Sequence, residues 1–291
     1  MTGALLNGAL DGGVLGLAAA GFTVLWSVTG VVNLAQGALV IVGAYSSALL
    51  APGLGPLAGV CGATLVGAAL GWALQRGLLN LLLGQPAYIE LTGTFGVGLA
   101  LAALASLLFS NNYRSVPWAL ATTDLVAGPL RVQTAALVAF ACALAATFAL
   151  GQLERRTRFG LALRAASVDR DAGRLIGLPV PALFALAGSL SAAAAALAGG
   201  LLALTGPFTA ADSNQLLVLV AAAAVIGGAG KVWGAFAAAV GLGAIEGAVA
   251  YWAPAQVSDD LALGLLLAAM AARTVRSRTA GGGQRTFGGV T

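Results

Sequence analysis

A long run without a single charged side chain is the feature that most constrains this fold. The residues from Gly12 to Gln75 include no Asp, Glu, Lys or Arg, and most of them are apolar. A transmembrane helix needs about 20 apolar residues, so this run is long enough for up to three spans. Only 8% of the whole chain is charged, whereas a soluble domain carries about 25%. The sequence therefore predicts an integral membrane protein, with membrane lipid as its surroundings.

The residue types present exclude several classes of site. The chain has no histidine, the side chain most often used for acid–base chemistry and metal binding. Its two cysteines, Cys61 and Cys142, both lie in apolar runs. We therefore expect no catalytic centre, no metal and no cofactor. The net charge of +4 comes from residues at predicted span ends, so it does not indicate nucleic-acid binding.

Clusters of Gly, Pro and Asn divide the apolar runs into separate helices. We expect an all-α polytopic protein in which residues 1–279 form a single transmembrane domain. A short ninth span near 261–272 would be only about 18 Å long, so eight or ten spans are the alternatives to nine. The Gly-rich residues 280–291 are expected to form a disordered cytoplasmic tail. The first eight spans are predicted at 6–28, 34–51, 57–76, 89–109, 132–152, 180–204, 213–230 and 232–251.

One strongly charged segment, residues 154–179, interrupts the apolar chain. It contains six of the 14 basic residues, and a charged side chain at the bilayer centre costs roughly 2.5–3.5 kcal/mol. The segment must therefore lie in water between two spans. Short cytoplasmic loops collect Lys and Arg, which places it in the cytoplasm. Alternating the other spans leaves only Arg114 and Arg131 on the outer side, with the N-terminus outside and the C-terminus inside.

The charged segment also has helical periodicity. A helix over residues 161–176 would carry an apolar stripe of Leu161, Ala165, Val168, Ala172 and Leu175. A polar stripe would contain Arg164, Ser167, Asp171 and Arg174, with the last two able to pair at i,i+3. Such a helix either lies on the membrane surface without a partner or docks on another protein.

Three segments of the sequence, in this order, carry a family pattern. The first is Asn33-Leu34-Ala35-Gln36-Gly37 leading to Tyr45, and the last is Ile226 to Ala235 followed by Glu246. The middle segment matches at Arg156, Thr157, Gly160, Ala162, Arg164, Ala165, Asp169, Arg170, Leu175, Ile176 and Gly177. This middle segment resembles the cytoplasmic coupling loop of ABC importer permeases, in the form found in the branched-chain amino acid permease family. The resemblance extends from about Leu6 to Trp252, although the family usually has His at Gln36 and Glu at Ala38.

The resemblance implies an ABC importer permease fold and the function of a permease subunit. Such a subunit translocates branched-chain or related amino acids across a bacterial cytoplasmic membrane by alternating access. The implied partners are a second permease subunit, identical or paralogous, two cytoplasmic ABC ATPase subunits and an extracytoplasmic solute-binding protein. The chain has no G-x-x-x-x-G-K-[ST] phosphate loop, so we do not expect it to be an ATPase itself. The residues implied in ATPase coupling are Arg164, Asp169, Arg170, Asp171, Arg174 and Gly177.

A second set of residues is a candidate for the solute pathway or for helix packing. Polar side chains at a membrane helix start either hydrogen-bond across helices or line a path, and glycines allow tight turns and close approach. Glu246 is the only acid well within a predicted span, where a carboxylate faces protein or a water-filled path. Asp11, in the first span, is interpreted in the same way. The set comprises Asn33, Gln36, Gly37, Gly227, Gly228, Gly230 and Glu246.

Three other functions are the alternatives to this interpretation. A permease of the same kind could carry urea or a short amide instead of an amino acid. A channel or ion-coupled carrier would work without any ATPase partner. A membrane-embedded enzyme would need ionisable groups clustered at one depth, and a chain with no His and one deep Glu lacks them.

Overall fold

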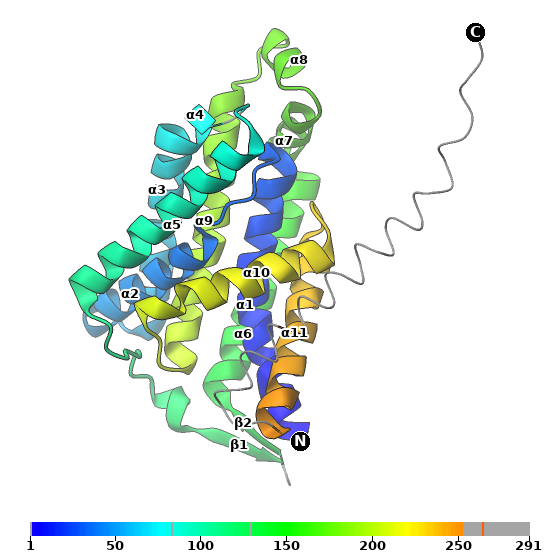
Figure 1. Ribbon diagram of the computed structural model, residues 1–291. Helices are drawn as coiled ribbons and strands as arrows, with labels where there is room; N and C mark the ends of the chain where they lie inside the picture. The colour runs from blue at the N-terminus through cyan, green and yellow to red at the C-terminus, as the bar shows by residue number, and fades with distance from the viewer. Residues whose placement is uncertain (1, 83, 128–129, 253–263, 265–291) are drawn as a thin grey trace.

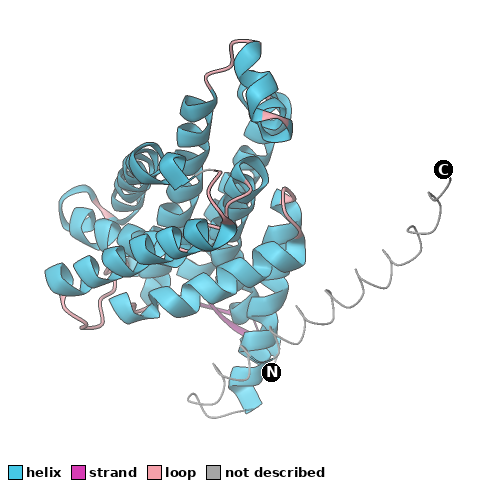
Figure 2. Cartoon of the chain, turned by 45° about the horizontal axis from the view of Figure 1, so that its top comes forward, coloured by secondary structure: helices cyan, strands magenta, loops and turns pink. Residues whose placement is uncertain are grey.

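Long apolar helices account for most of the described chain, and helix is the main element in Figure 2. The structure is a computed structural model that describes residues 2–82, 84–127, 130–252 and 264. Within these residues, eight helical segments are long and apolar enough to cross a membrane. They coincide with the first eight predicted spans, so the expected all-α polytopic fold is confirmed. The predicted ninth span, apart from Gly264, and the tail at 280–291 lie outside the described residues.

The long helices follow one another with short elements between them (Figure 1). In chain order they are α1 (Thr2–Thr29), α2 (Gln36–Leu54), α3 (Pro56–Leu74), α5 (Ala87–Phe109), α6 (Thr134–Arg156), α9 (Val180–Thr205), α10 (Ser213–Gly227) and α11 (Val232–Trp252). The third span continues from α3 through a π-helical turn, η1 (Gln75–Leu79), into α4 (Asn80–Leu82). The other short elements are η2 (Ala119–Thr122), β1 (Asp124–Ala127), β2 (Leu130–Gln133), α7 (Arg158–Val168), α8 (Arg170–Leu175) and η3 (Ala210–Asp212).

A short antiparallel hairpin is the one departure from helix and turn among the named elements. Strands β1 and β2 pair in a register that places Asp124 opposite Gln133. The hairpin lies at the end of the bundle where the N-terminus is found (Figure 1). The backbones of Arg114 and Phe208 exchange two hydrogen bonds of 3.1 and 2.9 Å. These bonds connect the loop after α5 to the residues that follow α9.

Helix α1 lies at the centre of the bundle and α5 at its edge. In the most apolar stretch of α1, 83% of the residues are buried, compared with 11% in α5. Leu107 on α5 is 83% exposed, as expected for an apolar side chain on a helix that crosses a membrane.

Glycines allow α1 and α11 to pack backbone against backbone. A methyl group added to Gly8 or Gly12 of α1, or to Gly243 or Gly247 of α11, would overlap the backbone of the opposite helix. The two helices lie side by side in opposite directions (Figure 1). The contact sequences are G-A-L-D-G in α1 and G-A-I-E-G in α11. Both have the small-x-x-x-small spacing that favours close packing of membrane helices.

We expect Gly243→Ala to destabilise the bundle, because the new methyl group meets the carbonyl oxygen of Gly8. Overpacking of this kind costs typically 1–3 kcal/mol. The matched control is Gly241→Ala on the same helix, where an added methyl group has no atom within 4 Å. Thermal unfolding in detergent should show a lower midpoint for the first variant and no decrease for the second. Equal midpoints would contradict this account of the α1–α11 contact.

Candidate functional site

The charged segment folds as two short helices at one end of the bundle. Figure 1 places α7 and α8 at the end opposite the hairpin and the N-terminus, with α8 farthest out. This arrangement corrects the single helix predicted over residues 161–176. The chain is extended at Asp169, with φ −149° and ψ 111°, so helical structure stops after Val168 and restarts at Arg170.

The turn from α6 into α7 depends on Thr157 and Gly160. The Thr157 hydroxyl accepts a hydrogen bond from the Gly160 amide at 3.1 Å and so caps α7. A side chain on Gly160 would overlap the Glu154 carbonyl group. Arg164 donates from Nη1 to the same Glu154 carbonyl oxygen. These contacts fix α7 against the end of α6.

Both ends of α8 are capped. Asp169 Oδ1 accepts from the amides of Asp171 and Ala172 at 2.9 and 3.0 Å, and this competition for amides explains the break after α7. At the other end Gly177 has φ +84°, and the Leu178 amide donates to the Gly173 carbonyl at 3.0 Å. This is a Schellman cap. Asp169 and Gly177, two residues of the predicted coupling set, therefore determine where α8 starts and stops.

The predicted apolar stripe is not the face that packs on the bundle. Leu163 and Ala166 are buried, and they belong to a cluster with Leu25, Val180 and Phe184. The stripe residues instead point away from the protein. We call Leu161, Val168, Leu175 and Ile176 the tip surface; they are 62%, 88%, 89% and 74% exposed.

Charged side chains border the tip surface. Asp171 and Arg174 form the predicted i,i+3 pair at 3.2 Å, with both side chains mostly exposed. Arg170 points the other way. Its Nη2 donates to the carbonyl oxygen of Thr29 at the end of α1, and its guanidinium lies 5.4 Å from the centre of the Phe184 ring.

Gln36 and its neighbours hold helices together inside the bundle. Gln36 is fully buried; its Nε2 lies 3.2 Å from Ala18 O and 3.3 Å from Ser191 O, and its Oε1 accepts from the Ser191 hydroxyl. It therefore links α1, α2 and α9. Asn33 Oδ1 accepts from the Ala35 amide and caps the turn before α2. A side chain on Gly37 would overlap the backbone of α10. These contacts join neighbouring helices within the bundle.

The glycines before α11 form a tight turn. Gly228 and Gly230 have φ +94° and +74°, a region in which only glycine is unstrained. The Lys231 amide closes the turn on the Gly228 carbonyl at 3.1 Å. A side chain on Gly227 would overlap the first turn of α11. These three positions shape the turn that joins α10 to α11.

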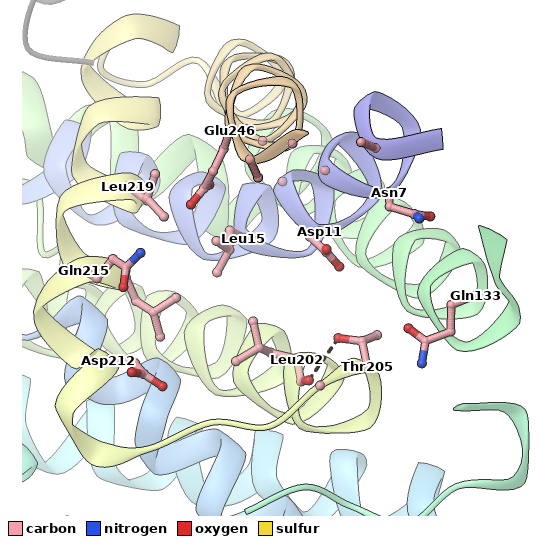
Figure 3. Close-up of a pocket in the computed structure, with 18 of the residues that line it drawn as sticks. Asn7, Asp11, Leu15, Gln133, Leu202, Thr205, Asp212, Gln215, Leu219 and Glu246 are labelled. Carbon is pink, nitrogen blue, oxygen red and sulfur yellow. Dashed lines mark hydrogen bonds between the residues drawn. The ribbon is translucent and has the colours of Figure 1, made fainter. Parts of the chain in front are cut away.

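Glu246 and Asp11 both line a cavity of about 580 Å³, which lies in the half of the bundle near the N-terminus. Figure 3 shows both carboxylates directed into a hollow above Leu202 and Thr205. Helices α1, α9, α10 and α11 contribute to the walls. The described residues that line it include no Lys or Arg. Besides Thr205, other polar residues of the lining are Asn7, Gln133, Asp212 and Gln215.

Sequence reasoning missed these four other polar residues. Asp212 also has a structural role, because its Oδ2 accepts from the Thr209 amide at 2.8 Å in a capping box. Gln133 and Gln215 lie at the starts of α6 and α10, and no sequence motif around them indicates a functional role. One signal was available for the acids: the similar sequences G-A-L-D-G and G-A-I-E-G place an acid before a contact glycine in both α1 and α11.

Comparison with known proteins now identifies the family. A sequence family described as "Branched-chain amino acid transport system / permease component" matches residues 4–270. The chain belongs to this permease family. The permease is 25% identical to the high-affinity branched-chain amino acid transport system permease protein LivH of Salmonella typhimurium, over 90% of both chains. It is 27% identical to BraD of Pseudomonas aeruginosa, which has the same description, over 90% of this chain and 91% of that one.

Among solved structures, PsaBC from Streptococcus pneumoniae in complex with Fab matches the permease with a TM-score of 0.46. The sequence identity is 16%, and the match covers 91% of this chain and 90% of that chain. The family predicted from the three sequence segments is confirmed by the family match.

We expect Asp169→Ala to loosen α8, because two amides of its first turn lose their acceptor. Loss of an N-cap costs about 1 kcal/mol, which corresponds to about fivefold faster amide exchange if α8 opens locally. Hydrogen exchange of residues 170–175 measures this. Asp171→Ala is the control, since it removes only an exposed ion pair, worth about 0–1 kcal/mol. Equal exchange in the two variants would rule out the capping role.

Proposed function

We propose that the permease is the membrane subunit of an ATP-binding cassette importer for branched-chain or related amino acids. Family membership supports the transport role, and the names of the relatives support the solute class. The observation that carries the coupling to ATP is the tip surface, a set of exposed apolar side chains on capped helices at the end of the bundle. Separate ATPase subunits would supply the energy, because the sequence contains no phosphate loop of its own.

The tip surface has the properties of a protein docking site. Exposed apolar side chains outside hydrocarbon mark interaction surfaces, and Val168 and Leu175 are 88% and 89% exposed. The position of α8 at the far end of the bundle (Figure 1) favours a protein partner over the membrane surface. The Asp171–Arg174 pair beside it adds charges that select the partner. We assign this face to a cytoplasmic ATPase subunit, with the N-terminus outside and the C-terminus inside.

Force applied to the tip surface would reach the spans through two routes. The turn held by Thr157 and Gly160 joins α7 to α6, and the Schellman cap at Gly177 leads directly into α9. Rocking of these helices, and of those in a second permease subunit, would alternate access to a central path. An extracytoplasmic binding protein would deliver the solute at the hairpin end.

The cavity beside Asp11 and Glu246 is the proposed solute path within this chain. Its volume of about 580 Å³ lies in the usual range for small-molecule sites. Two carboxylates would attract the ammonium group of an amino acid, and Leu15, Leu202 and Leu219 would contact an apolar side chain. Urea and short amides have no positive charge for these carboxylates to bind. The ammonium group is therefore the feature by which this cavity would distinguish an amino acid from those solutes.

We expect Leu175→Glu to weaken association with the ATPase subunits while leaving the bundle intact, because this side chain contacts little of its own chain. Co-purification of the ATPase with the tagged permease should fall by about tenfold. This is the effect of losing about 1–2 kcal/mol of binding free energy at one important interface residue. Tyr113→Glu is the control, since Tyr113 is 76% exposed at the opposite end. Undiminished co-purification, or uptake that needs no ATPase, would refute the proposal.

We expect Glu246→Gln and Asp11→Asn each to reduce uptake of a branched-chain amino acid. A hydrogen bond to a charged group contributes about 1.5–3 kcal/mol, so the concentration for half-maximal uptake should rise about tenfold or more. Glu90→Gln is the control, because Glu90 lies on α5 outside the cavity and accepts from the Gly84 amide. Uptake in membrane vesicles, corrected for protein amount, measures the effect. Wild-type uptake by both cavity variants would remove this cavity from the path.

A further inference from the structure

We propose that Arg170 is a positioning residue that ties the coupling segment to α1 and, through α1, to the cavity at the other end of the bundle. This inference rests on the proposed function. It concerns the hydrogen bond between the Arg170 side chain and the last residue of α1. Arg170 does not contact the solute or the ATPase in this assignment.

Arg170 contacts two residues that lie outside the charged segment, one in α1 and one in α9. Its guanidinium donates to the Thr29 carbonyl oxygen, 141 positions earlier in the chain, and stacks over Phe184 of α9. The last carbonyl groups of a helix have no partner within that helix, and they carry the negative end of the helix dipole. A half-buried arginine at this point satisfies one of those carbonyl groups with a charge-assisted hydrogen bond.

The other described contacts of the segment do not provide the same link. Arg164 bonds to Glu154 at the end of α6, and Arg174 pairs with Asp171 inside α8. Leu163 and Ala166 pack on α1 and α9 through apolar surface, which has no preferred direction. Among the hydrogen bonds described for the segment's side chains, that of Arg170 is the one that reaches α1.

Helix α1 is suited to carry a displacement along its length. It has 28 residues and is therefore about 42 Å long. Its contacts with α11 are backbone to backbone at Gly8 and Gly12, and Gln36 bonds to its Ala18 carbonyl. Thr29 is the last residue of α1, and the helix ends there because Gly30 has φ +76°.

The far end of α1 carries Asp11 at the cavity. A pull on Thr29 would move Asp11 relative to α10, which forms another wall of the cavity. Motion of α8 on its ATPase partner would thus change the cavity without any part of the intervening bundle having to unfold.

The first test uses the full chain in lipid nanodiscs. For Arg170→Gln we expect amide exchange to rise about tenfold in residues 29–33 and 170–175 together, as expected for losing a charged hydrogen bond. Arg158→Gln is the matched control, because Arg158 is an exposed arginine at the start of α7. If exchange in residues 29–33 does not respond to Arg170→Gln, the tie does not exist and the inference is wrong.

The second test uses the complex purified with its ATPase subunits and reconstituted in proteoliposomes. We expect Arg170→Gln to keep ATPase association and ATP hydrolysis but to lower solute uptake per ATP about fivefold or more, with Arg170→Lys in between and Arg158→Gln unchanged. Normal uptake per ATP in Arg170→Gln would reduce Arg170 to a structural role and overturn the inference. Uptake by the unmodified permease without any ATPase would instead overturn the proposed function.

Discussion

Direct backbone contact between helices is the interaction on which the rest of the structure depends. In a bilayer the hydrophobic effect gives helices little reason to associate, so packing and a few hydrogen bonds must hold them together. Glycines provide this packing where α1 meets α11, and Gly199 of α9 does so against Val40 of α2. Gln36 adds hydrogen bonds among α1, α2 and α9. The centre of the bundle is therefore closely packed, and α5 at its edge presents exposed leucines.

The glycine contact between α1 and α11 also shapes the cavity lined by Asp11 and Glu246. Asp11 and Glu246 each immediately precede a glycine of the α1–α11 contact, Gly12 and Gly247. The backbone packing of these two helices thus sets where the two carboxylates lie relative to each other and to α10. A change in that packing would change the charge distribution of the cavity at once, which gives a physical basis for linking helix motion to solute binding.

At the other end of the bundle, the capping residues of α7 and α8 determine where the exposed apolar side chains lie. Thr157, Asp169 and Gly177 terminate short helices that have too few turns to be stable alone. Their effect is to hold Val168 and Leu175 out in solvent. Thr157, Asp169 and Gly177 of the family pattern thus shape this segment, and Leu175 and Ile176 of the same pattern belong to the surface proposed to bind a partner.

The sequence by itself determined the eight described spans, the charged segment between two of them and the family, because hydrophobic length and charge are local properties of the chain. Tertiary structure decided the break at Asp169, since helical periodicity does not show which amides a carboxylate will bind. It also decided which face of α7 is buried, because Leu25 and Phe184 lie far away in the chain. Only the folded chain brings Asn7, Gln133 and Gln215 to the cavity of Asp11 and Glu246, since they come from separate elements whose packing no local pattern encodes.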